Sequence, residues 1–318
     1  MRKLKPSMEE FLTTYNNVTL PNLLASGYVP NAINKREALA ATTRIWTTSA
    51  PTPVAQILDD TIDGGKEYDV PVRIFHPDPE KELPVMIYFH GGGGLAGSVT
   101  VYDPILRNMA VKTGHIVVAP EYSLAPERPY PMAEIDVRTV YYGTFPLLEK
   151  RGVRHNGTLC FGGDSFGGAL TAALARDIQH DEKPFLSGMF LIYPGLDFTM
   201  SFPSIQEEIN GKGYLLEISN LEWYYNQYFV HGENRYDASP IFNEMTSRMP
   251  RALIITAEFC PLRDEGKAYA DRLSEIGVET EYLNIENMPH TFMNMEDLAK
   301  EECQRVYAAI HDFLHKNG

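Results

Sequence analysis

Short apolar runs alternate with longer amphipathic stretches along most of the chain. The runs are rich in β-branched and aromatic residues and end at polar or turn residues, which is typical of buried strands. They cover residues 70–76, 84–90, 115–122, 158–163, 189–195, 251–256 and 278–285. The stretches expected to be helical cover 132–150, 167–179, 266–277 and 298–316. This alternation predicts an α/β fold with a central, mostly parallel sheet flanked by helices.

Two segments do not follow this alternation. Residues 1–45 show helix and loop patterns with stripes of Leu, Tyr and Ala, and residues 199–235 are rich in aromatic side chains. We expect both to form a helical cap on a single domain that spans 1–318. Aromatic residues of the second segment could line a pocket beneath the cap, although some must pack the cap onto the core. They are Trp223, Tyr224, Tyr225, Tyr228 and Phe229.

The composition narrows the classes of partner. Of the 318 residues 44% are hydrophobic, which is enough for a sizeable core. The apolar stretches are shorter than a membrane-spanning helix, and the N-terminal residues lack the apolar core of a secretory signal. A formal net charge of −14 disfavours nucleic acids and anionic lipids, and it fits neutral small molecules better. The oligomeric state stays open, and a homo-oligomer is one of the states that the sequence allows.

Cysteine and histidine usage gives no sign of a metal site. The three cysteines, Cys160, Cys260 and Cys303, are odd in number and far apart, so neither a disulfide framework nor a CxxC zinc site is expected. This usage favours a reducing, cytoplasmic compartment. His311 and His315 have a metal-like spacing on a terminal helix, but without a third ligand they are expected to lie on a solvated face.

GDSFGG, at residues 163–168, lies directly between a predicted strand and a helix of small residues. In a G-x-S-x-G elbow the serine sits on a strained turn, and the flanking glycines let the backbone pass without steric collision. The bare motif also occurs by chance in glycine-rich loops, but here the required strand–turn–helix context is present. Ser165 is therefore the candidate nucleophile.

HGGGG, at residues 90–94, follows the predicted strand 84–90. A glycine run exposes backbone N–H groups and allows close approach of a ligand, which is how an oxyanion is held. A phosphate-binding loop would need a following Lys-Ser/Thr or a GxGxxG frame, and GGGGLAGSV has neither. We therefore predict an oxyanion hole formed by the amides of Gly92, Gly93 and Phe166.

A serine nucleophile needs a base, and His290 in MPHTF lies just after the last predicted strand. A lone histidine is more often a packed or surface residue than a catalyst. Its position after Ser165 in the chain, on a loop that follows the sheet, makes His290 the candidate base.

Together these motifs resemble the hormone-sensitive-lipase branch of the α/β-hydrolases, the GDXG esterases, from about residue 70 onwards. The matching motifs are HGGG at 90–93, EYSLAPERPYP at 121–131, GDSFGG at 163–168, YPGLD at 193–197, ASP at 238–240 and PLRDEG at 261–266. The resemblance implies an α/β-hydrolase fold with a helical cap, and the family's chain order of nucleophile, acid and histidine. It also implies a carboxylic-ester hydrolase without a cofactor, acting on short to medium acyl chains. Phe166 replaces the family's usual alanine, which is expected to narrow the pocket but to leave the backbone amide in place.

The chain departs from the family pattern at the triad acid. The family motif is DPLRDEG, whose first aspartate orients the histidine, and this chain has Cys260 at that position. Glu258, Asp264 and Glu265 match carboxylates that the family carries beside the usual acid, so none of them is expected to replace it. Asp197 is the open alternative, because the end of its strand neighbours the acid strand in this fold.

A thiol at this position should impair catalysis. A neutral thiol is too weak a partner to hold the imidazole tautomer or to stabilise imidazolium, and a thiolate would keep the imidazole protonated. We expect the Cys260 sulfur to lie within about 4 Å of the His290 ring, on the side opposite Ser165.

Three functions therefore remain open. The first is a serine esterase, with activity reduced by Cys260. The second is a catalytically weak, small-molecule binding protein on the same fold, because loss of a triad residue can accompany such a change. The third is an amidase or thioesterase, which uses the same machinery on another leaving group. Retention of both Ser165 and His290 favours a hydrolase over a binding protein.

Overall fold

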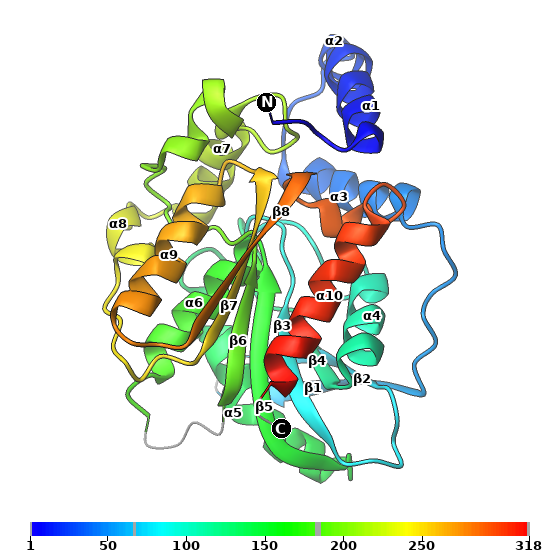
Figure 1. Ribbon diagram of the computed structural model, residues 1–318, viewed down its shortest axis with the longest axis vertical. Coiled ribbons are helices and arrows are strands. Elements are labelled where there is room, and N and C mark those ends of the chain that lie inside the picture. Colours follow the sequence, from blue (N-terminus) through cyan, green and yellow to red (C-terminus); the bar gives the residue numbers. More distant parts are fainter. Residues whose placement is uncertain (1, 66–67, 182–185, 317–318) are drawn as a thin grey trace.

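A single sheet forms the centre of the protein in the computed structural model, which describes residues 2–65, 68–181 and 186–316 (Figure 1). The other residues of the expected 1–318 domain lie outside the described part. Within it, eight strands pair in the order β1-β2-β4-β3-β5-β6-β7-β8. They are β1 (Gln56–Asp63), β2 (Asp69–His76), β3 (Leu83–Phe89), β4 (Ile116–Pro120), β5 (His155–Asp164), β6 (Leu186–Ile192), β7 (Ala252–Phe259) and β8 (Thr280–Pro289). From β4 to β8 all neighbours are parallel, and only the β1–β2 and β2–β4 pairs are antiparallel, so the predicted fold class is confirmed.

Burial explains which strands the sequence revealed. β4 is buried at every position, and β3 is buried from Val85 to Phe89, because helices cover both faces of the sheet. The edge strand β1 instead alternates, and its Asp59 and Asp63 are exposed. An acidic edge strand of this kind has no continuous apolar run, so it is absent from the strands predicted from the sequence.

Helices cover the two faces of the sheet (Figure 1). α4 (Asp103–Thr113) and α10 (Lys300–His315) contact each other on one face. On the other face lie α5 (Met132–Lys150), α6 (Phe166–Ile178) and α9 (Arg263–Glu275). Four of these helices were predicted, and α4, with eleven residues, was missed.

The two segments outside the alternation lie above the carboxyl ends of the parallel strands (Figure 1). The N-terminal segment contains α1 (Pro6–Thr14), a π-helical turn (Tyr15–Thr19), α2 (Leu20–Ala25) and α3 (Ala32–Trp46). The later segment contains short turns at Pro203–Ile205 and Glu207–Gly211, then α7 (Ile218–Tyr228) and the start of α8 (Arg235–Ala238). Two further short turns, Pro240–Phe242 and Phe292–Asn294, follow in the body of the domain.

Three hydrogen bonds join the N-terminal segment to the later one. Arg2 Nη2 donates to Asn210 Oδ1 at 2.8 Å, and Asn16 Nδ2 donates to the Gly213 carbonyl at 2.8 Å. Lys35 Nζ donates to Asn220 Oδ1 at 3.0 Å. The segments therefore form one layer, although about 200 residues separate them in the chain. None of the described helices combines the length and the apolar character needed to cross a membrane.

Candidate active site

The candidate residues lie at the carboxyl ends of neighbouring strands. Ser165 follows β5, Cys260 follows β7, His290 follows β8, and the glycine loop 91–94 follows β3. Since β3, β5, β6, β7 and β8 are consecutive and parallel, these ends share one edge of the sheet. The topology thus brings together residues that are up to 200 positions apart in the chain.

Ser165 occupies a strained turn between β5 and α6, with φ 55° and ψ −117°. Such a conformation is costly for a residue with a side chain, and it persists only where the surroundings hold it. A Cβ at Gly163 or Gly167 would overlap the carbonyl oxygen of Phe89 on β3. The two motif glycines are therefore needed for the elbow to pack against the neighbouring strand.

The three residues predicted to form a triad are in contact, with His290 between Ser165 and Cys260. His290 Nε2 lies 2.9 Å from Ser165 Oγ, and the Cys260 sulfur lies 3.1 Å from His290 Nδ1. The amide of Leu262 donates to the same sulfur at 3.4 Å. The sulfur thus lies on the side of the imidazole opposite Ser165, at the distance expected from the sequence.

Burial keeps both partners of the Cys260–His290 contact neutral. Desolvation raises the pKa of the Cys260 thiol, and it lowers the pKa of His290 to about 3. A thiolate–imidazolium pair, one of the two states considered from the sequence, is therefore disfavoured. The contact instead joins a neutral thiol to a neutral imidazole, and the thiol can either accept from Nδ1–H or donate to Nδ1.

The carboxylates near the site are engaged elsewhere. Asp197 accepts hydrogen bonds from the amides and hydroxyls of Thr199 and Ser201 at 2.5–2.8 Å. Glu258 pairs with Arg2 at 3.1 Å and accepts from the Asn287 amide. No carboxylate of the described residues forms a hydrogen bond with His290. Asp197, the alternative candidate for the triad acid, therefore does not contact the histidine in this structure.

Two glycines of the loop, Gly92 and Gly93, line the same cavity as Ser165. Gly92 and Gly93 have φ values of 128° and 66°, which L side chains rarely adopt. A Cβ at Gly93 would come within 2.7 Å of the Tyr224 ring. Within the described part of the chain, the amides of Gly92 and Gly93 donate no hydrogen bond, so both are available to a ligand in the cavity.

Asp164 holds the glycine loop against the elbow, and it is not among the site residues predicted from the sequence. Its carboxylate accepts from the Gly91 amide at 2.9 Å and from the hydroxyls of Tyr88 at 3.1 Å and Tyr102 at 2.9 Å. Burial nevertheless raises the pKa of Asp164 to about 6. The only sequence signal was its place directly before Ser165, where a buried carboxylate can bridge two strand ends.

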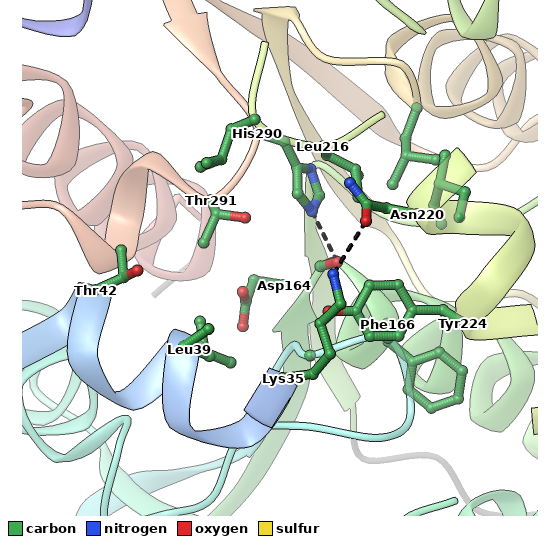
Figure 2. Close-up of a pocket in the computed structure, with 18 of the residues that line it drawn as sticks. Lys35, Leu39, Thr42, Asp164, Phe166, Leu216, Asn220, Tyr224, His290 and Thr291 are labelled. Carbon is green, nitrogen blue, oxygen red and sulfur yellow. Dashed lines mark hydrogen bonds between the residues drawn. The ribbon is translucent and has the colours of Figure 1, made fainter. Parts of the chain in front are cut away.

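A cavity of about 460 Å³, shown in Figure 2, has Ser165 and His290 among its lining residues. This volume lies in the range of sites for small organic ligands. Side chains from the body and from both segments above the sheet line it, and most of its surface is apolar. Of the five aromatic residues predicted to line a pocket or pack the cap, Tyr224 and Tyr225 line the cavity. Tyr228 packs on the ring of Phe166 with centroids 4.9 Å apart, so it belongs to the packing group.

The described residues contain no cluster of three or more His, Cys, Asp or Glu side chains placed to bind a metal. His311 and His315 stack on each other with ring centroids 4.3 Å apart on α10. His315 Nδ1 is engaged with the His311 carbonyl at 2.8 Å, and His311 Nδ1 with Asp312.

A family model described as the alpha/beta hydrolase fold matches residues 86–294. The chain belongs to the α/β-hydrolase family. The resemblance to the GDXG esterases drawn from its motifs is thereby confirmed. This hydrolase is 34% identical over 268 residues to an ethyl acetate hydrolase of Pseudomonas putida, a match that covers 82% of each chain. It is 28% identical to an arylesterase of Saccharolobus solfataricus, over 78% of this chain and 81% of the relative.

A solved esterase structure from Pyrobaculum calidifontis superposes on this hydrolase with a TM-score of 0.87 and 30% identity. The superposition covers 98% of this chain and 99% of the other. The similarity thus extends beyond the family match at 86–294 into the N-terminal segment, which the motifs could not assign.

Proposed function

We propose that the protein hydrolyses carboxylic esters of short to medium acyl length through Ser165, with turnover reduced by Cys260. The reaction class follows from the family and from relatives named as esterases: the protein is a carboxylesterase-type hydrolase. The observation that supports the specific residues is the 2.9 Å contact between Ser165 Oγ and His290 Nε2 at the base of an apolar cavity. The cavity volume of about 460 Å³ supports the acyl range.

In the proposed acylation step, the Ser165 hydroxyl attacks the ester carbonyl and its proton passes to Nε2 of His290. The carbonyl oxygen becomes an oxyanion, which the amides of Gly92, Gly93 and Phe166 would stabilise. His290 then gives the proton to the departing alkoxide, and the alcohol leaves. The acyl group stays bound to Ser165 as an ester.

In deacylation, water gives a proton to His290 Nε2 and attacks the acyl-enzyme carbonyl. The same amides hold the second oxyanion. As the intermediate collapses, the proton returns to Ser165 and the carboxylic acid leaves. We propose that the two segments above the sheet, residues 1–45, described from residue 2 onwards, and residues 199–235, act as the cap that limits the acyl group and excludes water.

The thiol of Cys260 affects this cycle through the tautomer of His290. The productive imidazole carries its proton on Nδ1, so that Nε2 can accept from Ser165. A carboxylate only accepts hydrogen bonds and therefore selects this tautomer, whereas a neutral thiol can also donate to Nδ1 and so place the proton on Nε2. Cys260 is thus a positioning residue that selects the productive form poorly and offers no charge to the developing imidazolium.

Two observations favour a hydrolase over a small-molecule binding protein. The serine and histidine keep a hydrogen-bond distance, and the strained elbow around Ser165 is retained. An amidase or thioesterase would use the same residues, and the names of the relatives favour esters. We also place the protein in the cytoplasm, because its three cysteines are buried and free.

The test is hydrolysis of a p-nitrophenyl ester series from acetate to palmitate by the protein and by Ser165→Ala. We expect the highest kcat/KM at short to medium acyl length and loss of hydrolysis above background in Ser165→Ala. Turnover that survives in Ser165→Ala would assign the nucleophile to another residue. Saturable binding of these esters without any turnover by the natural chain would favour the binding protein instead.

A further inference from the structure

One cation enters the otherwise mostly apolar cavity. Lys35 extends from α3 toward α7, and its Nζ donates to Asn220 Oδ1 at 3.0 Å (Figure 2). The same Nζ lies 5.8 Å from the ring centre of Trp223 and 5.5 Å from that of Tyr224. An ammonium group has three N–H donors, and within the described residues only one of them has a hydrogen-bond acceptor, since the two rings offer only weak cation–π attraction at these distances.

Lys35 has no carboxylate partner within the described residues, whereas Arg2, Lys5 and Arg36 of the same segment each pair with a glutamate. Arg36, the next residue on α3, pairs with Glu127 at 2.6 Å, and Lys5 pairs with Glu302 at 2.8 Å. Desolvation lowers the pKa of Lys35, and no acidic neighbour offsets it. A half-buried ammonium without a counter-ion is unfavourable, which is unexpected if Lys35 only braces α3.

The carboxylate of Asp164, which also lines the cavity, cannot serve as the counter-ion of Lys35 by direct contact. Asp164 is the only carboxylate that lines the cavity in the part of the chain described. Its oxygens already accept from Gly91, Tyr88 and Tyr102. A carboxylate of a bound ligand would supply the charge that Lys35 lacks, inside the space that the ester must occupy.

We propose that Lys35 recognises a carboxylate carried by the ester substrate, which makes it a specificity-determining residue. The proposal rests on the proposed function and narrows its substrate class to monoanionic esters, whereas the net charge of −14 alone favoured neutral molecules. The carboxylate can belong to the acyl part, as in a half-ester of a dicarboxylic acid, or to the alcohol part, as in an acylated hydroxy acid. Both present the same chemistry to Nζ, a charge-assisted hydrogen bond inside an apolar wall.

The experiment compares matched esters that differ only in this charge. Monoethyl glutarate and ethyl pentanoate test the acyl part, and 4-acetoxybutanoate and butyl acetate test the alcohol part. Hydrolysis is followed by product chromatography for the natural chain, Lys35→Met and Lys35→Arg. Lys212→Met is the matched control, because it removes one positive charge from the same layer and Lys212 is exposed and outside the cavity.

We expect Lys35→Met to lower the ratio of kcat/KM for the anionic to the neutral ester by about 10- to 100-fold in one of the two pairs. Most of the change should be in KM, because the ammonium binds substrate away from the reacting carbonyl. Lys35→Arg should keep much of the ratio, since it keeps the charge. Lys212→Met should leave the ratio unchanged, and the pair that responds identifies the part of the ester that carries the carboxylate.

Three results would overturn the proposal. One is an equal loss on anionic and neutral esters in Lys35→Met, together with a lower Tm, which would make Lys35 a brace between α3 and α7. Another is Ser165-dependent hydrolysis of the neutral esters with no hydrolysis of either anionic ester, which leaves the esterase intact. The third is an unchanged kcat/KM of Lys35→Met on all four esters. Failure of the natural chain on all four esters and on the p-nitrophenyl series would instead overturn the proposed function as well.

Discussion

Cys260→Asp is the substitution that tests the impaired triad most directly. The sulfur lies 3.1 Å from His290 Nδ1. The oxygens of an aspartate side chain are one bond further from Cβ than this sulfur, so a carboxylate at position 260 can reach the imidazole at the length of about 2.7–2.9 Å that charge-assisted N–H···O bonds have. The amide of Leu262, which now donates to the sulfur, can donate to the second oxygen. The site therefore already holds donors for both carboxylate oxygens.

The expected gain comes from the charge that forms on His290 when Ser165 gives up its proton. Two unit charges about 4 Å apart attract by about 4 kcal/mol at an effective dielectric constant of 20. Only part of this charge is developed in the transition state, and about 1.4 kcal/mol corresponds to a factor of ten in rate. We therefore expect kcat to rise by about 10- to 1000-fold, while KM changes little because residue 260 contacts the histidine and not the ester.

The assay is p-nitrophenyl butyrate hydrolysis under saturating conditions, with Tm measured on the same samples. Cys260→Asn is the matched control, since it has nearly the shape of aspartate without the charge. It should gain little, because an amide can donate to Nδ1 and select the unproductive tautomer as the thiol does. Cys260→Ala should stay within about tenfold of the natural chain, if the thiol contributes as little as its neutrality implies.

Unchanged turnover in folded Cys260→Asp would contradict an impaired triad. A loss of activity by about 100-fold or more in Cys260→Ala would contradict it as well, because the thiol would then be a working member of the triad. In either case another group supports His290, and a double substitution with Asp197→Asn would show whether that group is Asp197.

Three further predictions use the same site. A fluorophosphonate probe should label Ser165 and no other residue, and mass spectrometry of the labelled peptide checks this. Because burial lowers the pKa of His290 to about 3, the imidazole of the natural chain stays neutral as the pH falls from 7 to about 5, and kcat/KM should lose no activity there through this group. A carboxylate in Cys260→Asp favours the protonated ring and raises that pKa, so the acid limb should move to higher pH, and coincident pH profiles would contradict this. Gly167→Ala should lower the free energy of unfolding, measured in urea, by about 1–3 kcal/mol, because the added Cβ overlaps the Phe89 carbonyl. Gly195→Ala is the control: its Cβ meets only ordinary van der Waals contacts, so the free energy of unfolding should change little.

The elements that could be predicted from the sequence are those in which burial or steric crowding restricts the residue types at neighbouring positions of the chain. The central strands are covered on both faces, so runs such as that around Val85 are apolar at successive positions. The elbow left a readable motif because sterics at Gly163 and Gly167 admit only glycine. β1 was missed because it is exposed along one side and carries aspartates at positions where a buried strand would be apolar.

The parts of the site that the sequence did not reveal depend on contacts between distant segments. Lys35 and Asn220 are 185 positions apart, and no periodicity in either segment predicts that their side chains meet above Ser165. The bond from the Gly91 amide to Asp164 likewise joins two strand ends that are neighbours only in the folded sheet. In contrast, the register of PLRDEG placed Cys260 at a strand end, and the neighbouring strand β8 then brings His290 beside it.

The attachment of the N-terminal segment has a consequence for the order in which the protein is assembled. Arg2 pairs with Glu258, the Lys5 amide donates to the Asn287 carbonyl, and Ser7 donates to the Leu298 carbonyl. During synthesis at about 5–20 residues per second, these partners emerge roughly 15–60 s after the segment itself. The N-terminal segment, which forms one wall of the cavity, is thus synthesised first but can pack in place only after its partners near the C-terminus have emerged. A nascent chain therefore contains the strand that leads to Ser165 well before its binding site can close.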